Sequence, residues 1–168
     1  MSSSKKLLQS ASGFIDQSGG DLFVEDVFSI DTYKGTSSSG NQIVNGIDLA
    51  NEGGMVWLKN RDTTNGGLMD TERGVGKIHY TYNTYATDTE ASGYGLSSFN
   101  NNGFTLGQEF HGSTNSGSNF VSFSFRKSKR FFDIQTWTGN GTLGRQISHS
   151  LNCDVGMVIV KRTDHSAS

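Results

Sequence analysis

Hydrophobic and polar residues alternate along much of the chain with a period of two residues. The clearest case is Val121, Phe123 and Phe125, which are separated by single serines and followed by Arg126. Successive side chains of a strand point to opposite faces, so this alternation predicts a half-buried strand. Runs of the same kind predict strands at 28–33, 42–47, 55–59, 67–72, 77–82, 104–106, 119–127, 130–138, 145–149 and 157–161.

Turn-forming residues lie between these predicted strands. Asn-Gly pairs, which readily adopt positive φ in tight hairpins, occur at 45–46, 65–66, 102–103 and 140–141. A helix is expected only near residues 6–13 and in a turn or two elsewhere. Antiparallel strands with one polar and one apolar face pack as two sheets or close into a barrel. We therefore predict an all-β fold, with an antiparallel β-sandwich as the first choice.

Composition and charge narrow the classes of protein. Of the 168 residues, 33% are hydrophobic, 22 are glycine and none is proline, so Gly, Asn and Ser must supply the turns. A formal net charge of −2 excludes a strongly basic nucleic-acid footprint. The longest apolar runs, around 155–160, are far shorter than the roughly 18 residues that span a bilayer. We expect no nucleic-acid partner, no membrane span and, from the polar start of the chain, no secretory signal.

The sequence contains an internal repeat. The stretch FSIDTYKGTSSSGNQIVNGI, which starts at Phe28, aligns with FDIQTWTGNGTLGRQISHSL, which starts at Phe132. After a two-residue deletion, GMVWLKNRD from Gly54 aligns with GMVIVKRTD from Gly156. A period of about 100 residues is typical of a tandem array of whole small domains.

The repeat divides the chain into three parts. Residues 1–24 precede the repeat, and residues 25–131 form the first unit. Residues 132–168 either begin a second unit, as expected if the chain is a fragment of a longer parent, or supply closing strands of the first. We favour a fragment of a longer parent, because a natural chain that ended in half a unit would expose unpaired strand edges, which proteins normally avoid.

Several carboxylates are candidates for a glycosidase pair, since glycoside hydrolysis needs an acid and a base or nucleophile on either side of the bond. The candidates are Asp62, Asp70, Glu72, Asp88, Glu90 and Glu109. They do not form the compact arrangement on one strand that glucanase sandwiches use. Asp62, like its repeat counterpart Asp164, is expected to cap a turn or to pair with Arg61 or Arg73. We therefore predict that the protein is not an enzyme.

Metal and thiol chemistry have weak support. The four histidines are scattered, without the spacing that places two imidazoles on one metal. Cys153 stands alone beside an acid, which disfavours a reactive thiolate. Residues 88–90 and 100–102 are rich in oxygen ligands but lack a calcium-loop pattern. No cofactor, metal site or catalytic residue is predicted.

Aromatic residues point to recognition. Tyr80, Tyr82, Tyr85 and Tyr94 lie with Phe99 in a stretch rich in Thr, Ser, Asn and Gly. Rigid rings among small polar residues are typical of carbohydrate-binding surfaces, although half of the rings could instead face the core. We name these four tyrosines as candidate glycan-binding residues. The basic run at 126–130 is interpreted as a linker or hairpin turn between the units, or as a docking site.

The N-terminal part is too short to form its own core, yet it carries apolar side chains. These are Leu7, Leu8, Phe14, Ile15, Leu22 and Phe23. Because a partner surface would bury them, we predict that residues 1–24 are an attachment arm.

Long phrases of the sequence resemble the N-terminal part of tail-fibre-like virion proteins of tailed bacteriophages, especially those of marine phages. Among them are KKLLQSASG, VEDVFSIDTYKGT, NGIDLANEGGMVWLKNRD, LSSFNNNGFTLG and FVSFSFRKSKRFFDIQTWTGNGTLGRQISHSL. The resemblance implies a concanavalin-A-like or jelly-roll β-sandwich unit, often repeated, in a virion tail fibre that is assembled in the host cytoplasm. It implies docking on phage tail proteins such as an adaptor, nozzle or baseplate protein, and a homotrimer. It brings no catalytic residues.

Three functions follow as expectations. The first is a structural component of a tail fibre, which anchors the fibre to the virion through the arm and presents a distal host-recognition part. The alternative is a lectin-like module that contacts host surface glycans through the candidate tyrosines. A glycosidase that degrades the cell envelope comes last.

Overall fold

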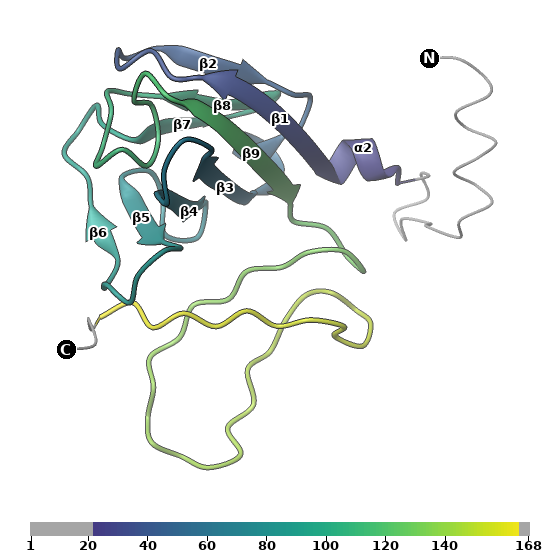
Figure 1. Ribbon diagram of the computed structural model, residues 1–168. Coiled ribbons are helices and arrows are strands. Elements are labelled where there is room, and N and C mark those ends of the chain that lie inside the picture. Colours follow the sequence, from purple (N-terminus) through teal and green to yellow (C-terminus); the bar gives the residue numbers. More distant parts are fainter. Residues whose placement is uncertain (1–21, 165–168) are drawn as a thin grey trace, which may run out of the picture.

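The computed structural model describes residues 22–164 and contains a β-sandwich followed by a C-terminal segment without strands (Figure 1). The elements are α2 (Val24–Val27), β1 (Phe28–Lys34), β2 (Asn41–Val44), α3 (Leu49–Glu52), β3 (Gly54–Asn60), β4 (Gly66–Asp70), β5 (Lys77–Tyr80), β6 (Asp88–Thr89), β7 (Leu96–Asn100), β8 (Gly103–Leu106) and β9 (Asn119–Arg126). The predicted all-β, antiparallel sandwich is confirmed. The strand order does not single out a jelly roll, which remains a prediction.

The strands form two antiparallel sheets. One has the order β1-β9-β3-β4-β5-β6, and the other has the order β2-β8-β7. Strand β9 lies between β1 and β3, with Phe125 opposite both Phe28 and Met55. The last strand in the sequence therefore joins the first to the rest of the larger sheet.

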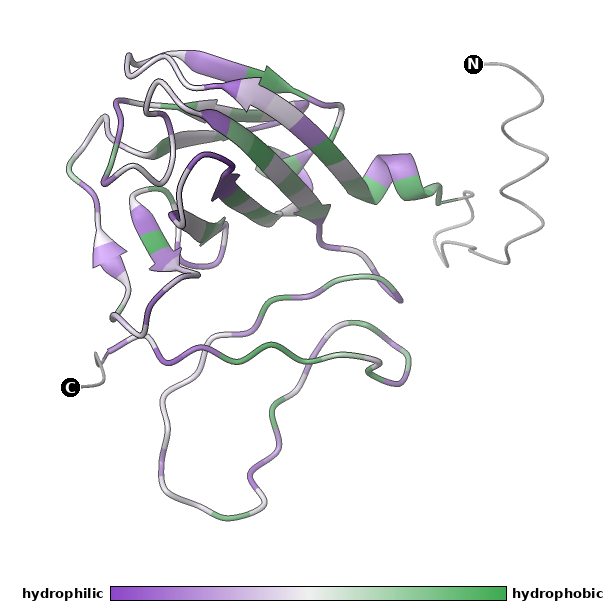
Figure 2. Cartoon of the chain, in the orientation of Figure 1, coloured by the Kyte–Doolittle hydropathy of each residue, from purple (hydrophilic) through white to green (hydrophobic). Residues whose placement is uncertain are grey.

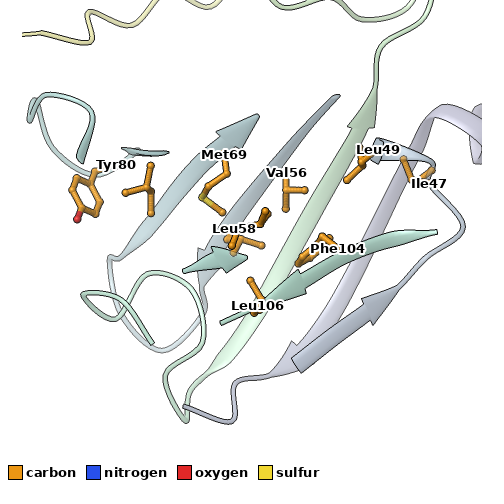
Figure 3. Packing of buried hydrophobic residues seen from close by; sticks show 10 residues of the cluster. Ile47, Leu49, Val56, Leu58, Met69, Tyr80, Phe104 and Leu106 are labelled. Carbon is orange, nitrogen blue, oxygen red and sulfur yellow. The ribbon is translucent and has the colours of Figure 1, made fainter. Parts of the chain in front are cut away.

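The core lies between the two sheets (Figure 3). Val56, Leu58 and Met69 from the larger sheet pack against Phe104 and Leu106 from the smaller one. Ile47, just before α3, and Leu49, its first residue, belong to the same cluster and are fully buried. Complete burial of an aliphatic side chain contributes about 1.5–3 kcal/mol, so this cluster is the main source of stability.

In the second half of β9, the polar side chains face the core and the aromatic side chains face outward, which is the reverse of what hydropathy suggests. Ser122 and Ser124 are 0% exposed and face the inside of the sandwich, whereas Phe123 and Phe125 lie half-buried on the outer face. Asn45 donates a hydrogen bond from Nδ2 to Ser124 Oγ at 2.9 Å, which satisfies that buried hydroxyl. Small serines leave room for the second sheet, and the aromatic rings find partners outside.

The outer face of the larger sheet carries a row of aromatic rings. The ring centroids of Trp57 and Phe123 are 5.5 Å apart, and those of Phe28 and Phe125 are 4.9 Å apart. Phe132, just after the first unit, contacts Phe125 at 5.2 Å. Contacts among these rings explain how large apolar side chains stay partly covered on an outer face.

A buried polar loop precedes β9 and ties the sheets together. Asn115 is 0% exposed and donates from Nδ2 to Ser38 O at 2.8 Å and to Gly107 O at 2.7 Å. Its Oδ1 accepts from Thr36 N at 3.0 Å. The same loop passes so close to Gly35 that an added Cβ would lie 1.7 Å from Ser116 O. This contact requires glycine at position 35.

Most of the predicted strands are found, and the differences are informative. Strands β6 and β7 were not predicted, because their sequences lack a clear apolar alternation. The strands predicted at 130–138, 145–149 and 157–161 are not strands here. Nor does any described residue after Arg126 add a strand to either sheet. Strand β9 is thus the last strand along the described residues, and the division of the chain at residue 132 stays a prediction.

The arm lies almost entirely outside the described residues. Leu7, Leu8, Phe14 and Ile15 and the helix expected near 6–13 fall in the part that is not described. Leu22 is 6% exposed and Phe23 is half-buried, so these two offer little free surface for docking. Among the described residues, no helix has the length and apolar character needed to cross a bilayer.

Candidate functional site

Three tyrosines gather beside β5 and β6. Tyr80 ends β5, and Tyr82 and Tyr85 follow on the turn that leads to β6. The ring of Tyr80 lies 5.4 Å from that of Tyr82 and 6.4 Å from that of Tyr85, both in edge-on geometry. The side chain of His111 approaches Tyr80 from the opposite loop, at 6.4 Å between centroids. The turn thus builds an aromatic corner.

A surface pocket of about 250 Å³ opens at this corner. It is lined by Tyr80, Tyr85, Ala86, Thr87 and Asp88. Tyr85 is 58% exposed and Tyr82, next to it, is 40% exposed, whereas Tyr80 is only 4% exposed. The two outer rings are therefore available to a ligand, and Tyr80 forms part of the wall.

Hydrogen bonds hold the polar groups of the pocket. The Tyr80 hydroxyl donates to Asp88 Oδ2 at 3.0 Å. Burial, and next this hydrogen bond to a carboxylate, raise the pKa of Tyr80, which keeps the phenol protonated. Asp88 Oδ1 accepts from Thr89 N at 2.8 Å. Asp88 is an acceptor at the pocket wall that a ligand hydroxyl could also use.

His79 on β5 contacts a residue of the pocket wall, Thr87. Burial, and next the charge of Arg73, lower the pKa of His79 to about 4. Its Nδ1 lies 2.8 Å from Thr87 Oγ1, so the imidazole and the threonine hydroxyl share a hydrogen bond. This contact positions the pocket residue Thr87 from inside the fold.

Glu90 is the most unusual group near the pocket. It is 6% exposed, and neither carboxyl oxygen has a hydrogen-bond partner in the described part of the chain. Burial raises the pKa of Glu90 to about 7; the Leu96 main chain acts in the opposite direction, and the charge of Asp88 adds to the rise. Gly95 packs against it so closely that a Cβ there would lie within 2.0 Å of the carboxyl oxygens.

The structure brings together three of the four candidate glycan-binding tyrosines. Tyr94, 38% exposed, has no ring contact with the others among the described residues. Sequence reasoning did not assign Thr87 or His111 to this site, and it weighed Asp88 only for hydrolysis or calcium. The one local signal for Thr87 and Asp88 is that they lie two and three residues after Tyr85, whereas His111 comes close only through tertiary packing.

The remaining carboxylates serve structural contacts. Asp62 does not pair with Arg61 or Arg73; it accepts from Asn119 N at 2.8 Å, which links the end of β3 to the start of β9. Arg73 instead donates from Nε to Asp70 at 2.6 Å. Within residues 22–164, no group of three or more His, Cys, Asp or Glu side chains could share a metal ion.

The C-terminal segment, residues 132–164, forms a second candidate surface outside the sandwich. Figure 2 shows hydrophobic residues along the part of this segment that approaches the C-terminus. Four successive side chains, Met157, Val158, Ile159 and Val160, are 79%, 70%, 69% and 64% exposed. An apolar run with this exposure marks an interaction surface.

The segment is held at both ends against the first unit. Near its start, Lys127 pairs with Glu72 at 2.5 Å and lies 3.6 Å from Asp133, so part of the predicted basic run forms ion pairs. Near its end, Thr163 O accepts from Thr87 N at 3.0 Å, beside the tyrosine pocket. The apolar run lies between these attachments.

Comparison with known proteins adds a family but no activity. No curated protein and no solved structure matches the chain. One family model does match it, over residues 24–168, and covers both the sandwich and the C-terminal segment. By this match, the chain belongs to the DUF7483 family, which is described as a domain of unknown function.

Proposed function

We propose that the protein is a structural component of a bacteriophage tail fibre, in which β-sandwich units follow one another along the chain. The arm at residues 1–24 would attach the fibre to tail proteins, and the sandwich would act as a spacer. The observation that carries this proposal is the course of the chain after β9. A complete sandwich leads directly into a repeat of its own first strands, with apolar side chains left exposed.

The exposed apolar run favours a role in assembly. Val158 and Val160 are 70% and 64% exposed, and burying such side chains is worth about 1.5–3 kcal/mol each. This gain is realised only when another polypeptide surface covers them. The expectation of three copies around a common axis comes from the resemblance to tail fibres and does not rest on these two side chains.

The test of this function is the molar mass of the full chain in solution, measured by light scattering. A trimer would have a mass of about 55 kDa, three times the 18.2 kDa of the chain. Removal of residues 1–24 should leave the trimer if the sandwich and its C-terminal segment associate, and should give monomers if the arm does. A monomer for the full chain as well as the shortened one would argue against a fibre component.

A second function, binding of saccharides from the host surface, is favoured by the tyrosine pocket. Tyr85 and Asp88 line the pocket, and Tyr82 presents a second exposed ring beside it. Sugar rings stack on aromatic faces, and their hydroxyls donate to carboxylates. The combination suits a neutral saccharide unit better than an anionic one, since Asp88 would repel a negative charge.

The saccharide proposal is tested by glycan-array binding of the full chain. Tyr85→Ala and Tyr82→Ala should each reduce the signal at least about tenfold, which corresponds to the loss of one stacking contact. Tyr94→Ala is the matched control, because Tyr94 is also exposed but lies apart from the pocket. Equal loss in all three variants, or no binding by the unaltered chain, would count against this function.

A further inference from the structure

Equivalent residues of the two repeats have opposite environments. Val56 and Leu58 on β3 are 0% exposed, whereas their counterparts Val158 and Val160 are 70% and 64% exposed. The local sequence is nearly the same, so the difference comes from what surrounds each stretch. In the first unit, these side chains face the core between the two sheets.

Main-chain hydrogen bonding shows the same contrast. Strand β3 pairs along one edge with β9 and along the other with β4. In the described part of the chain, the main chain of residues 156–162 makes no hydrogen bond at all. A stretch with strand sequence and no strand neighbour has every N–H and C=O free to accept a partner.

Two glycines that the repeats share indicate which strand is missing from the second repeat. At Gly54, a Cβ would lie 2.1 Å from Phe125 O on β9, and at Gly35 it would lie 1.7 Å from Ser116 O in the loop before β9. The counterparts Gly156 and Gly139 have nothing within 4 Å. In the first unit, glycine is required at these two positions by close contacts with β9 and the loop before it. The second repeat keeps both glycines although the contacts are missing.

An aromatic pair also indicates that the second repeat lacks a β9-like strand. In the first unit, Tyr33 on β1 stacks on Phe120 of β9, with centroids 5.2 Å apart and planes 8° from parallel. Its counterpart Trp137 is 45% exposed. Gly144 keeps the left-handed conformation of Gly40, with φ of 74° and 88°, so part of the backbone already matches.

We propose that residues 132–164 are the accepting half of a second sandwich, and that their occupant is a polypeptide segment of the β4–β9 type. Its β9-like strand, alternating aromatic residues with serine, inserts between 132–138 and 156–162 as β9 inserts between β1 and β3. This inference rests on the proposed function, because it assumes that sandwich units follow one another. It adds to that function the identity of the segment that would cover residues 132–164.

The experiment extends the full chain after Ser168 with a second copy of residues 67–127. Asp164 aligns with Asp62, so residues 165–168 take the place of 63–66 and the register of the first unit is kept. Hydrogen exchange of the amides at 156–162 should slow by at least about 100-fold relative to the unextended chain, since these amides would enter a sheet. Unchanged exchange in a soluble extended chain would overturn the proposal.

Matched variants distinguish strand pairing in the proposed register from non-specific hydrophobic association. Val158→Asp together with Val160→Asp should abolish the new protection, because both side chains would face the second core. Leu143→Asp should leave it intact, since Leu143 is 101% exposed and its counterpart is Ser39, in the loop between β1 and β2. Equal effects of the two kinds of variant would contradict the register that we propose.

A second measurement covers the case in which the extended chain fails to fold. A peptide of residues 115–127 added to the unextended full chain should shift the fluorescence of Trp137 to shorter wavelength, and Trp137→Phe should remove that shift. A peptide with the same residues in shuffled order should have no effect, and failure of the native-order peptide here would overturn the proposal. Neither measurement depends on oligomeric state, so a monomeric chain would refute the fibre proposal and leave this one standing.

Discussion

Replacing Glu90 with glutamine should change the stability of the protein, relative to the unaltered chain, in a direction that becomes more favourable as the pH rises from 4.5 to 8. The carboxyl group is buried against Gly95, and its oxygens have no hydrogen-bond partner in the described part of the chain. Glutamine has nearly the same shape and no charge. The substitution therefore isolates the cost of keeping an ionised carboxylate at this position.

The magnitude follows from the pKa in the two states. Burial raises the pKa of Glu90 from 4.5 to about 7, so the folded protein holds a proton that the unfolded chain has lost between these values. Stability is full below pH 4.5 and falls as the pH rises through 7. At 1.36 kcal/mol for each pH unit, the loss in the unaltered protein is about 3 kcal/mol at pH 8.

The assay is urea unfolding of the two proteins at pH 4.5 and pH 8, followed by tryptophan fluorescence. A buried glutamine amide without a partner costs about 1–3 kcal/mol at any pH, so only the change with pH is diagnostic. The free energy of unfolding of Glu90→Gln, relative to the unaltered protein, should rise by about 3 kcal/mol between the two pH values.

The control is Glu52→Gln on α3, where the side chain is exposed. Its free-energy difference from the unaltered protein should change much less between pH 4.5 and pH 8. If the difference for Glu90→Gln stayed constant with pH to within about 0.5 kcal/mol, the buried carboxylate would not carry the cost assigned to it.

Three further predictions concern packing and polar contacts. Gly54→Ala should destabilise the protein by about 3 kcal/mol or more in urea unfolding, because the new Cβ meets Phe125 O, whereas Gly156→Ala should change stability by less than about 0.5 kcal/mol. Asn115→Ala should cost about 2–4 kcal/mol, measured by thermal unfolding, since it removes a buried set of hydrogen bonds to three main-chain groups. The pKa of His79 is lowered to about 4, so stability should fall as the pH drops from 6.5 towards 4, and His79→Gln should flatten that part of the pH profile.

The sequence alone determined the elements whose pattern is local. Alternation in β3 and β9 predicted both strands, and the Asn-Gly pair at 102–103 predicted the hairpin between β7 and β8, whose strands meet at Asn100 and Gly103. The repeat predicted that residues 156–162 have strand character. These features depend on side-chain periodicity and turn conformation, which neighbouring residues in the chain specify.

Tertiary structure decided which face of each strand is buried. Hydropathy would place Phe123 and Phe125 inside, yet both rings lie on the outer face of β9, and Ser122 and Ser124 are fully buried. The close approach of the second sheet favours small side chains there, and hydrogen bonds satisfy their hydroxyls. Spacing between sheets is a property of the whole sandwich, so no local pattern carries it.

Tertiary structure also decided the candidate site and the state of the C-terminal segment. His111 reaches the ring of Tyr80 from a loop distant in the sequence, and Glu90 is buried against Gly95. Residues 156–162 have the sequence of a strand but not its structure. A strand is held by hydrogen bonds to neighbouring strands, so a sequence can encode the capacity to form one, while only the presence of those neighbours makes it form.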